Sequence, residues 1–222
     1  MKWSTKVGKF SGINVYIHFK FWLIILFLGY SYWKETSDVI ITVTSVFFVM
    51  AVFFCVLLHE FGHALTAKKF GIKTKDITLL PIGGLARLEK IPENPVHELW
   101  ITIAGPLVNA VIALLIFVFL KLFGSYQPIE SLKFIEVPFL QKIMLVNVAI
   151  FFFNLLPAFP MDGGRILRAI LAMKMDYSKA TQLAVKVGQM MAVVFGVVGF
   201  FANPFLVIIA LFIWIGATME GN

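Results

Sequence analysis

Residues 39–63 read VIITVTSVFFVMAVFFCVLLHEFGH, an uncharged run of 20 residues followed directly by two histidines and a glutamate. Twenty residues of helix span about 30 Å, the thickness of the hydrocarbon core of a bilayer. The run therefore predicts a membrane-spanning helix. Three ionisable side chains within five positions at its end are costly beside lipid unless they have a partner, and a metal cation is the natural one.

The composition of the whole chain indicates an integral membrane protein. Of the 222 residues, 60% are hydrophobic and 14% are charged, whereas soluble domains average about 45–50% and about 25%. Phenylalanine alone occurs 24 times, and a soluble core of this size could not bury so much apolar surface. In a membrane protein the net charge of +7 is informative about which loops face the cytoplasm. No nucleic-acid partner is expected. Because Cys55 is the single cysteine, an intrachain disulfide and an all-thiolate metal site are excluded.

Further apolar segments extend the prediction to a bundle of six spans. Residues 99–120 are long enough to cross a membrane unaided, whereas prolines and asparagines interrupt residues 143–161. Three shorter segments, each needing its flanks, cover residues 21–33, 187–202 and 205–219. The predicted fold class is an all-α polytopic membrane protein with six transmembrane helices and a small membrane-associated β-hairpin or sheet.

The basic residues predict the orientation of this bundle. With six spans, fifteen of the 19 Lys and Arg residues fall on the side that holds both termini. Cytoplasmic loops are enriched in Lys and Arg, so both termini, and the polar end of the second span, are expected on the cytoplasmic side of the cell membrane. No small-residue cleavage site follows the first span, which is therefore predicted to be a retained signal anchor.

A polar segment between the second and third spans predicts a β-hairpin. Residues 76–89 form two short strand-like runs joined at Gly83-Gly84. Two roles stay open for this hairpin. It could simply lie on the membrane surface, or its edge could bind an extended peptide.

The motif His59-Glu60-Phe61-Gly62-His63 predicts a zinc site. Residues i and i+4 share one face of a helix, so both imidazoles can bind one ion. Glu60 lies about 100° round the helix, where it can act as a general base without being a ligand. The alternative is that these side chains are merely interfacial polar groups at the end of a span.

A catalytic zinc usually has three protein ligands and one open position, so a third ligand is required. Cys55 and His63 are eight residues apart, about 12 Å along a helix, which is too far for one ion that also binds His59. His18 and His97 are expected to be interfacial. The remaining candidates are Asp162, beside the flexible Gly163-Gly164, and three glutamates, Glu89, Glu93 and Glu98.

Two motifs together resemble a known family. The motif at residues 59–63, followed about 100 residues later by NLLPAFPMDGGR at residues 154–165, resembles the site-2 protease family of intramembrane zinc metalloproteases, with the six-span archaeal members most similar. The segments Leu80-Pro81-Ile82-Gly83-Gly84 and Ala104-Gly105-Pro106-Leu107 extend the resemblance over nearly the whole chain. It implies one Zn²⁺ per chain bound by His59, His63 and Asp162, with Glu60 as the base. It also implies that residues 1–222 are a single transmembrane protease core, in which no PDZ or CBS domain is visible.

The expected activity is hydrolysis of a peptide bond within or next to the transmembrane helix of a substrate protein in the bilayer. Asn154, an otherwise expensive amide in an apolar segment, is our candidate donor to the oxyanion, although a helix–helix hydrogen bond is the alternative. Asn147 is expected to make only such a helix–helix bond. Rival functions are a metal-ion transporter and an inactive relative that binds membrane helices without cutting them. The natural substrate and the oligomeric state stay open.

Overall fold

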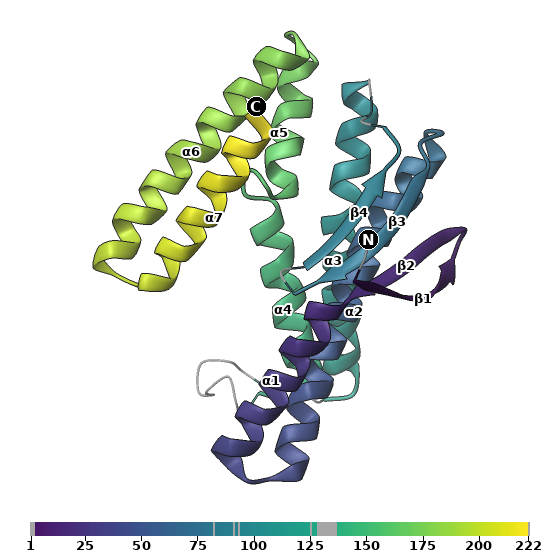
Figure 1. Ribbon diagram of the computed structural model, residues 1–222, viewed down its shortest axis with the longest axis vertical. Helices are drawn as coiled ribbons and strands as arrows, with labels where there is room; N and C mark the ends of the chain where they lie inside the picture. Colours follow the sequence, from purple (N-terminus) through teal and green to yellow (C-terminus); the bar gives the residue numbers. More distant parts are fainter. Residues whose placement is uncertain are drawn as a thin grey trace. The chain divides into compact units, whose positions relative to one another are not determined.

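The computed structural model describes residues 3–81, 83–90, 92, 94–124, 126–127 and 137–221. The helices are α1 (Phe19–Thr36), α2 (Val39–Lys69), α3 (Pro95–Leu122), α4 (Phe139–Asn154), α5 (Asp162–Ala172), α6 (Tyr177–Phe201) and α7 (Pro204–Gly221). The strands are β1 (Ser4–Phe10), β2 (Ile13–His18), β3 (Thr74–Leu80) and β4 (Gly83–Leu88), as Figure 1 shows. The chain divides into two compact units. The first comprises residues 1–90 and 107–150, and the second comprises residues 91–106 and 151–222.

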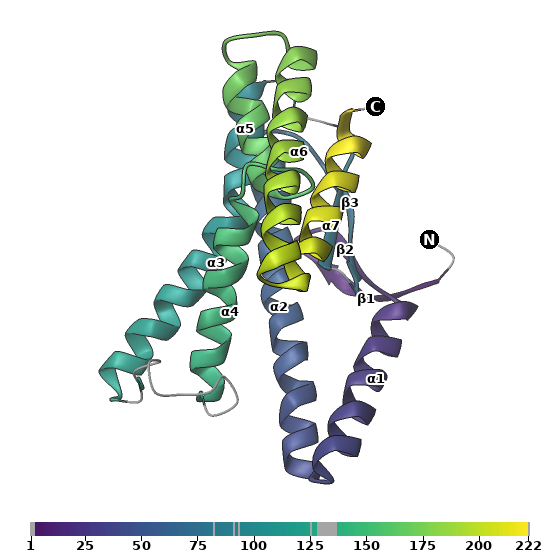
Figure 2. The same cartoon turned by 90° about the vertical axis from the view of Figure 1, so that its left-hand side faces the viewer.

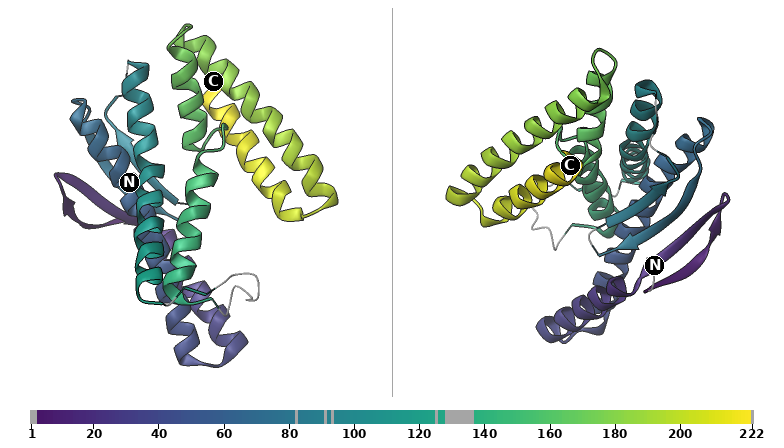
Figure 3. Two further views of the ribbon diagram at one scale, coloured as in Figure 1. Left: turned by 180° about the vertical axis from the view of Figure 1, so that it is seen from behind. Right: turned by 45° about the horizontal axis from the view of Figure 1, so that its top comes forward.

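The strands of the first unit form one sheet in the order β1-β2-β3-β4 (Figure 3). β1 and β2 pair antiparallel through a tight turn at Ser11 and Gly12, both of which have positive φ, as a type I′ hairpin turn requires. β2 and β3 pair in parallel, and α1 and α2 form the connection between them. β3 and β4 make the predicted hairpin, so that prediction is confirmed. The β1–β2 hairpin was not expected from the sequence.

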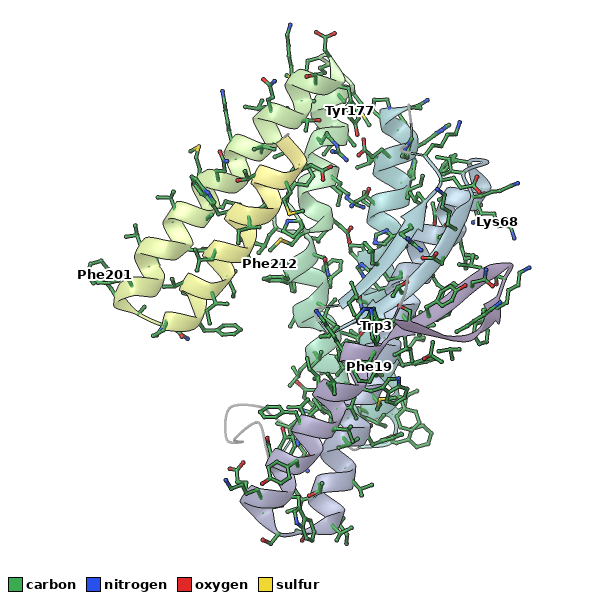
Figure 4. All side chains as sticks on the ribbon, viewed as in Figure 1. Trp3, Phe19, Lys68, Tyr177, Phe201 and Phe212 are labelled. Atoms are coloured by element: carbon green, nitrogen blue, oxygen red, sulfur yellow. The ribbon has the colours of Figure 1, made fainter. Side chains whose placement is uncertain are left out.

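The sheet packs against the C-terminal half of α2. Ile13, Ala64 and Ile77 form a buried cluster with Leu57 and Phe61. Lys68, labelled in Figure 4, donates from Nζ to the carbonyl oxygen of Ser11 at 3.2 Å. The half of α2 that carries the histidine motif is therefore supported by the sheet.

The N-terminal half of α2 lies beside α1 (Figure 2). The turn between these two helices is short, and Asp38 caps α2 by accepting from the backbone N–H groups of Ile40 and Ile41 at 2.7 and 3.0 Å. Beyond this cap α2 presents large hydrophobic side chains to the surroundings, including Phe47 and Phe54. Such an exposed apolar surface is expected of a helix in contact with lipid.

Four of the described helices, α2, α3, α6 and α7, are long and apolar enough to cross a membrane. α4 is apolar but has 16 residues, and α1 has 18 residues that include Lys20, Lys34 and Glu35. The exposed aromatic side chains of α6 and α7 include Phe201 and Phe212 (Figure 4). The structure therefore confirms a mainly helical architecture with several candidate spans and a small sheet, whereas the number of six spans stays a prediction.

The structure differs from the predicted fourth span, residues 143–161. α4 ends at Asn154, and residues 155–161 form turns that contain Pro157 and Pro160. This turn segment packs on α6 and α7 through a buried cluster of Ala158, Met161, Ala192 and Ile213. Because proline removes a backbone donor and restricts the preceding residue, the helix ends well before residue 161.

A buried ionic cluster joins four helical segments of the second unit. Arg168 on α5 donates from Nε and Nη2 to Glu98 Oε1, at 3.0 and 2.6 Å, and from Nη1 to Glu220 Oε1 near the end of α7. Its guanidinium also lies over the rings of Phe159 and Tyr177. Burial disfavours the charge on Arg168, but the two carboxylates outweigh burial and raise the pKa of the guanidinium above its ordinary value.

Replacing Arg168 by Met is expected to lower the free energy of unfolding by about 3–5 kcal/mol, because it leaves the carboxylate of Glu98 buried without its cation. The measurement is thermal or denaturant unfolding in detergent micelles, followed by circular dichroism. The matched control is Lys179→Met, which removes an exposed pair with Asp176 and should cost no more than about 1 kcal/mol. Equal losses in the two variants would contradict a stabilising role for the buried cluster.

Candidate metal centre

The two histidines of the motif lie on one buried face of α2. His59 and His63 are only 5% and 9% exposed, and their Nε2 atoms are 3.0 Å apart. Two nitrogens bound tetrahedrally to one zinc at about 2.0–2.1 Å would be about 3.3 Å apart. The two imidazoles therefore fit a shared zinc ion after a shift of a few tenths of an ångström.

The outer nitrogen of His59 has a partner that sequence reasoning missed. Its Nδ1 lies 2.6 Å from Oδ1 of Asn109, which is fully buried on α3. Metal-binding histidines typically donate their second ring N–H to a carbonyl or carboxylate oxygen, which leaves the other nitrogen for the metal. This observation supports the fit of His59 to a metal. The only sequence feature that pointed to this contact was Asn109 itself, a polar residue in the middle of an apolar segment.

Glu60 lies against the edge strand β4. Its Oε2 accepts a hydrogen bond from the backbone N–H of Ala86 at 3.0 Å. A Cβ atom added at Gly84 would lie 2.4 Å from Cγ of Glu60, so only glycine leaves room for the carboxylate in this position. The motif and the hairpin, predicted separately from the sequence, are thus in direct contact.

Asp162 is the first residue of α5 and is 8% exposed. A carboxylate in the first turn of a helix is favoured by the helix dipole. The residue that follows it must be glycine, because a Cβ at Gly163 would lie 2.1 Å from the carbonyl oxygen of Leu156. The close packing of this turn therefore determines where the backbone presents Asp162.

His59 and His63 of the first unit and Asp162 of the second unit are each buried, and each offers a donor atom of the kind that zinc prefers. The rival ligand Glu98 is instead bound to Arg168. Glu93 lies outside the described residues.

Other predicted residues occupy simpler positions. Cys55 is buried as a free thiol, and His18 caps α1 by accepting from the backbone N–H of Lys20 at 3.2 Å. Asn154 is the half-buried last residue of α4. Asn147 makes a hydrogen bond between helices, as predicted, by accepting from Asn109 Nδ2 at 2.8 Å.

Comparison with known proteins identifies relatives along most of the chain. A family model described as Peptidase family M50 matches residues 47–136 and 126–195. The solved structure of a site-2 protease from Methanocaldococcus jannaschii is similar to 99% of this chain and 96% of its own, with 35% identity and a TM-score of 0.69.

Curated relatives agree with this match and are longer than the chain. A zinc metalloprotease of Methanocaldococcus jannaschii is 37% identical over 224 residues, which cover 100% of this chain and 62% of the relative. Stage IV sporulation protein FB of Bacillus subtilis is 32% identical over 132 residues, which cover 59% of this chain and 42% of the relative. The chain thus spans less than two thirds of each of these curated relatives. The metal that the zinc metalloprotease relatives imply is Zn²⁺, which agrees with the donor set of two imidazoles and a carboxylate. From the family match, the structural similarity and these donors, we conclude that the chain belongs to peptidase family M50, the family of the site-2 proteases.

Proposed function

We propose that this protein is an intramembrane zinc metallopeptidase that hydrolyses peptide bonds within or next to the transmembrane helices of membrane-protein substrates. The observation that carries the proposal is the buried imidazole pair of His59 and His63, with Glu60 directly after His59 on the same apolar helix. A structural zinc site needs no adjacent base, whereas hydrolysis does.

In this proposal His59, His63 and Asp162 bind one zinc ion per chain. All three side chains are buried, and their donor atoms match the preference of zinc for imidazole nitrogen and carboxylate oxygen. Zinc, when bound, would supply a Lewis acid that polarises the peptide carbonyl and lowers the pKa of a water molecule. Three protein ligands leave one coordination position for this chemistry.

Glu60 is the proposed general base, which takes the proton from the attacking water. The N–H of Ala86 holds its Oε2, so the carboxylate has a defined orientation before substrate binds. Asn154 is the proposed donor to the oxyanion, on the strength of its position at the end of α4, eight residues before Asp162.

The substrate helix must unwind before its peptide bond can be attacked, because helical carbonyls are shielded and hydrogen-bonded. We propose that β4 binds the unwound segment. It is an edge strand of the described sheet, and Glu60 is hydrogen-bonded to its backbone. Strand addition would replace the hydrogen bonds that the substrate loses on unwinding. Residues that destabilise helices, such as Gly, Pro and Asn, should therefore favour cleavage.

The proposed setting is a multi-pass core of six spans in residues 1–222, with both termini and the zinc site towards the cytoplasm. The support is the Lys and Arg distribution, in which fifteen of 19 residues fall on one side of a six-span arrangement. The proposed partners are a transmembrane substrate protein and the surrounding lipid.

The test of the proposed function is cleavage of a labelled single-span peptide, carrying a Gly-Asn pair within its span, by purified zinc-loaded protein. Glu60→Gln should lower the cleavage rate by about 10²–10⁴-fold, because the base is lost, while zinc content stays unchanged. The matched control Glu35→Gln alters an exposed glutamate of α1 and should cleave normally. Zinc binding without cleavage by the unaltered protein would favour an inactive helix-binding relative, and zinc flux that persists in Glu60→Gln would favour a transporter.

Asp162→Asn is expected to lower zinc affinity by more than about 100-fold, a larger loss than outer hydrogen-bond partners cause. The measurement is competition with a chromophoric chelator in detergent. Asp176→Asn is the matched control, since Asp176 is 78% exposed in the side chain. Unchanged affinity in Asp162→Asn would remove Asp162 from the ligand set.

Gly84→Ala should displace Glu60, because the added Cβ would lie 2.4 Å from Cγ of Glu60. We expect cleavage to fall about 10- to 100-fold, the range that an ångström of misplacement can cost, with zinc affinity retained. Gly196→Ala is the control, since the nearest atom to its added Cβ is at 3.8 Å. Normal cleavage by Gly84→Ala would show that the observed position of Glu60 is not required.

A further inference from the structure

Within the first unit, an unbroken series of buried hydrogen bonds links the zinc-site histidine His59 to the backbone of α4. His59 Nδ1 lies 2.6 Å from Asn109 Oδ1, Asn109 Nδ2 donates to Asn147 Oδ1 at 2.8 Å, and Asn147 Nδ2 donates to the carbonyl oxygen of Ile143 at 2.8 Å. Both asparagines are fully buried. We call Asn109 and Asn147 the amide pair.

The direction of these bonds follows from the last acceptor. A backbone carbonyl can only accept, so the group of Asn147 that faces Ile143 must be the amide NH₂. The oxygen of Asn147 then faces Asn109, which must present its own NH₂ to that oxygen. The oxygen of Asn109 is left facing His59, and an oxygen at 2.6 Å requires a donor on the histidine.

The amide pair therefore determines the tautomer of His59. In the neutral ring the proton then lies on Nδ1 and the lone pair on Nε2, the nitrogen that faces His63. A neutral imidazole in water has no such constraint and exchanges its proton between the two nitrogens. Reversing the arrangement would place two oxygens against each other at Ile143, which is costly in a buried site.

We propose that Asn109 and Asn147 are positioning residues that hold His59 in the tautomer and ring orientation required for zinc. This inference rests on the proposed zinc site. It assigns to that site two residues that do not bind the metal themselves, Asn109 on α3 and Asn147 on α4. If the amides served only to join α3 to α4, their mutual bond would be enough. The series of hydrogen bonds instead continues beyond that bond to the ring of His59. The two buried amides therefore also orient the imidazole.

The first test is zinc affinity, measured by chelator competition in detergent. Asn109→Leu should weaken zinc binding by about 10- to 100-fold, the usual effect of removing an outer partner of a metal-binding histidine. Asn109→Asp should bind zinc more tightly than Asn109→Leu, because a carboxyl oxygen can still accept the Nδ1 proton although the donor to Asn147 is lost. Asn147→Leu should cause a smaller loss than Asn109→Leu, since Asn109 then keeps its contact with His59 but can turn over.

The matched control is Gln141→Leu. Gln141 is another fully buried amide of α4, and it is hydrogen-bonded to the backbone of Gln127 instead of the amide pair. It should cost stability without changing zinc affinity. The unfolding midpoint of each variant shows whether it folds. If Asn109→Leu does not fold, Asn109→Asp, which keeps a polar group at this position, is tested in its place.

The second test reads the tautomer directly in the metal-free protein. The chain has four histidines, so ¹⁵N-histidine labelling gives a spectrum that His59→Gln can assign. The unaltered protein should show His59 protonated on Nδ1, and Asn109→Leu should shift it towards protonation on Nε2. Unchanged zinc affinity and an unchanged tautomer in a folded Asn109→Leu protein would overturn the inference. Because neither measurement uses cleavage, a failure of the proposed peptidase activity would leave this result interpretable.

Discussion

The burial of two imidazoles on an apolar helix is the constraint on which the rest of the structure depends. His59 and His63 are almost inaccessible, and their Nε2 atoms face each other at 3.0 Å. In an apolar surrounding such groups are stable only with partners for both ring nitrogens. Asn109 provides the partner on the outer side of His59, and a shared cation fits the inner side. One requirement thus explains why Asn109 is a buried amide in an otherwise apolar helix.

The sheet supports the same half of α2 from another direction. Ile13 and Ala64 pack together, so the β1–β2 hairpin and the motif helix stabilise each other. β4 contributes a backbone donor to Glu60 and, at Gly84, the space that the carboxylate occupies. A small sheet beside this apolar helix therefore orients the proposed base, and its edge strand β4 lies next to that base.

In the second unit, close backbone packing determines the position of the Asp162 carboxylate. Met161, the residue at the N-cap position of α5, makes no side-chain cap hydrogen bond with the described residues. The turn before Asp162 is packed so closely that Gly163 has no room for a Cβ. The buried Arg168 then ties α5 to Glu98 and Glu220, which come from α3 and α7. Such a cluster is costly to break once formed, so it holds the segment around Asp162 in one arrangement.

Local patterns in the sequence were enough to predict the apolar helices, the hairpin at residues 76–89, the i, i+4 pair of histidines and the family, because helical periodicity and loop composition depend only on nearby residues. The β1–β2 hairpin was missed, since its apolar alternation is short and adjoins a span. The contact of Glu60 with Ala86 and the bond from Asn109 to His59 join residues 26 and 50 positions apart. Only the tertiary structure decided these, because a hydrogen bond between distant segments depends on how helices pack, and packing is a collective property of many side chains that no single motif records.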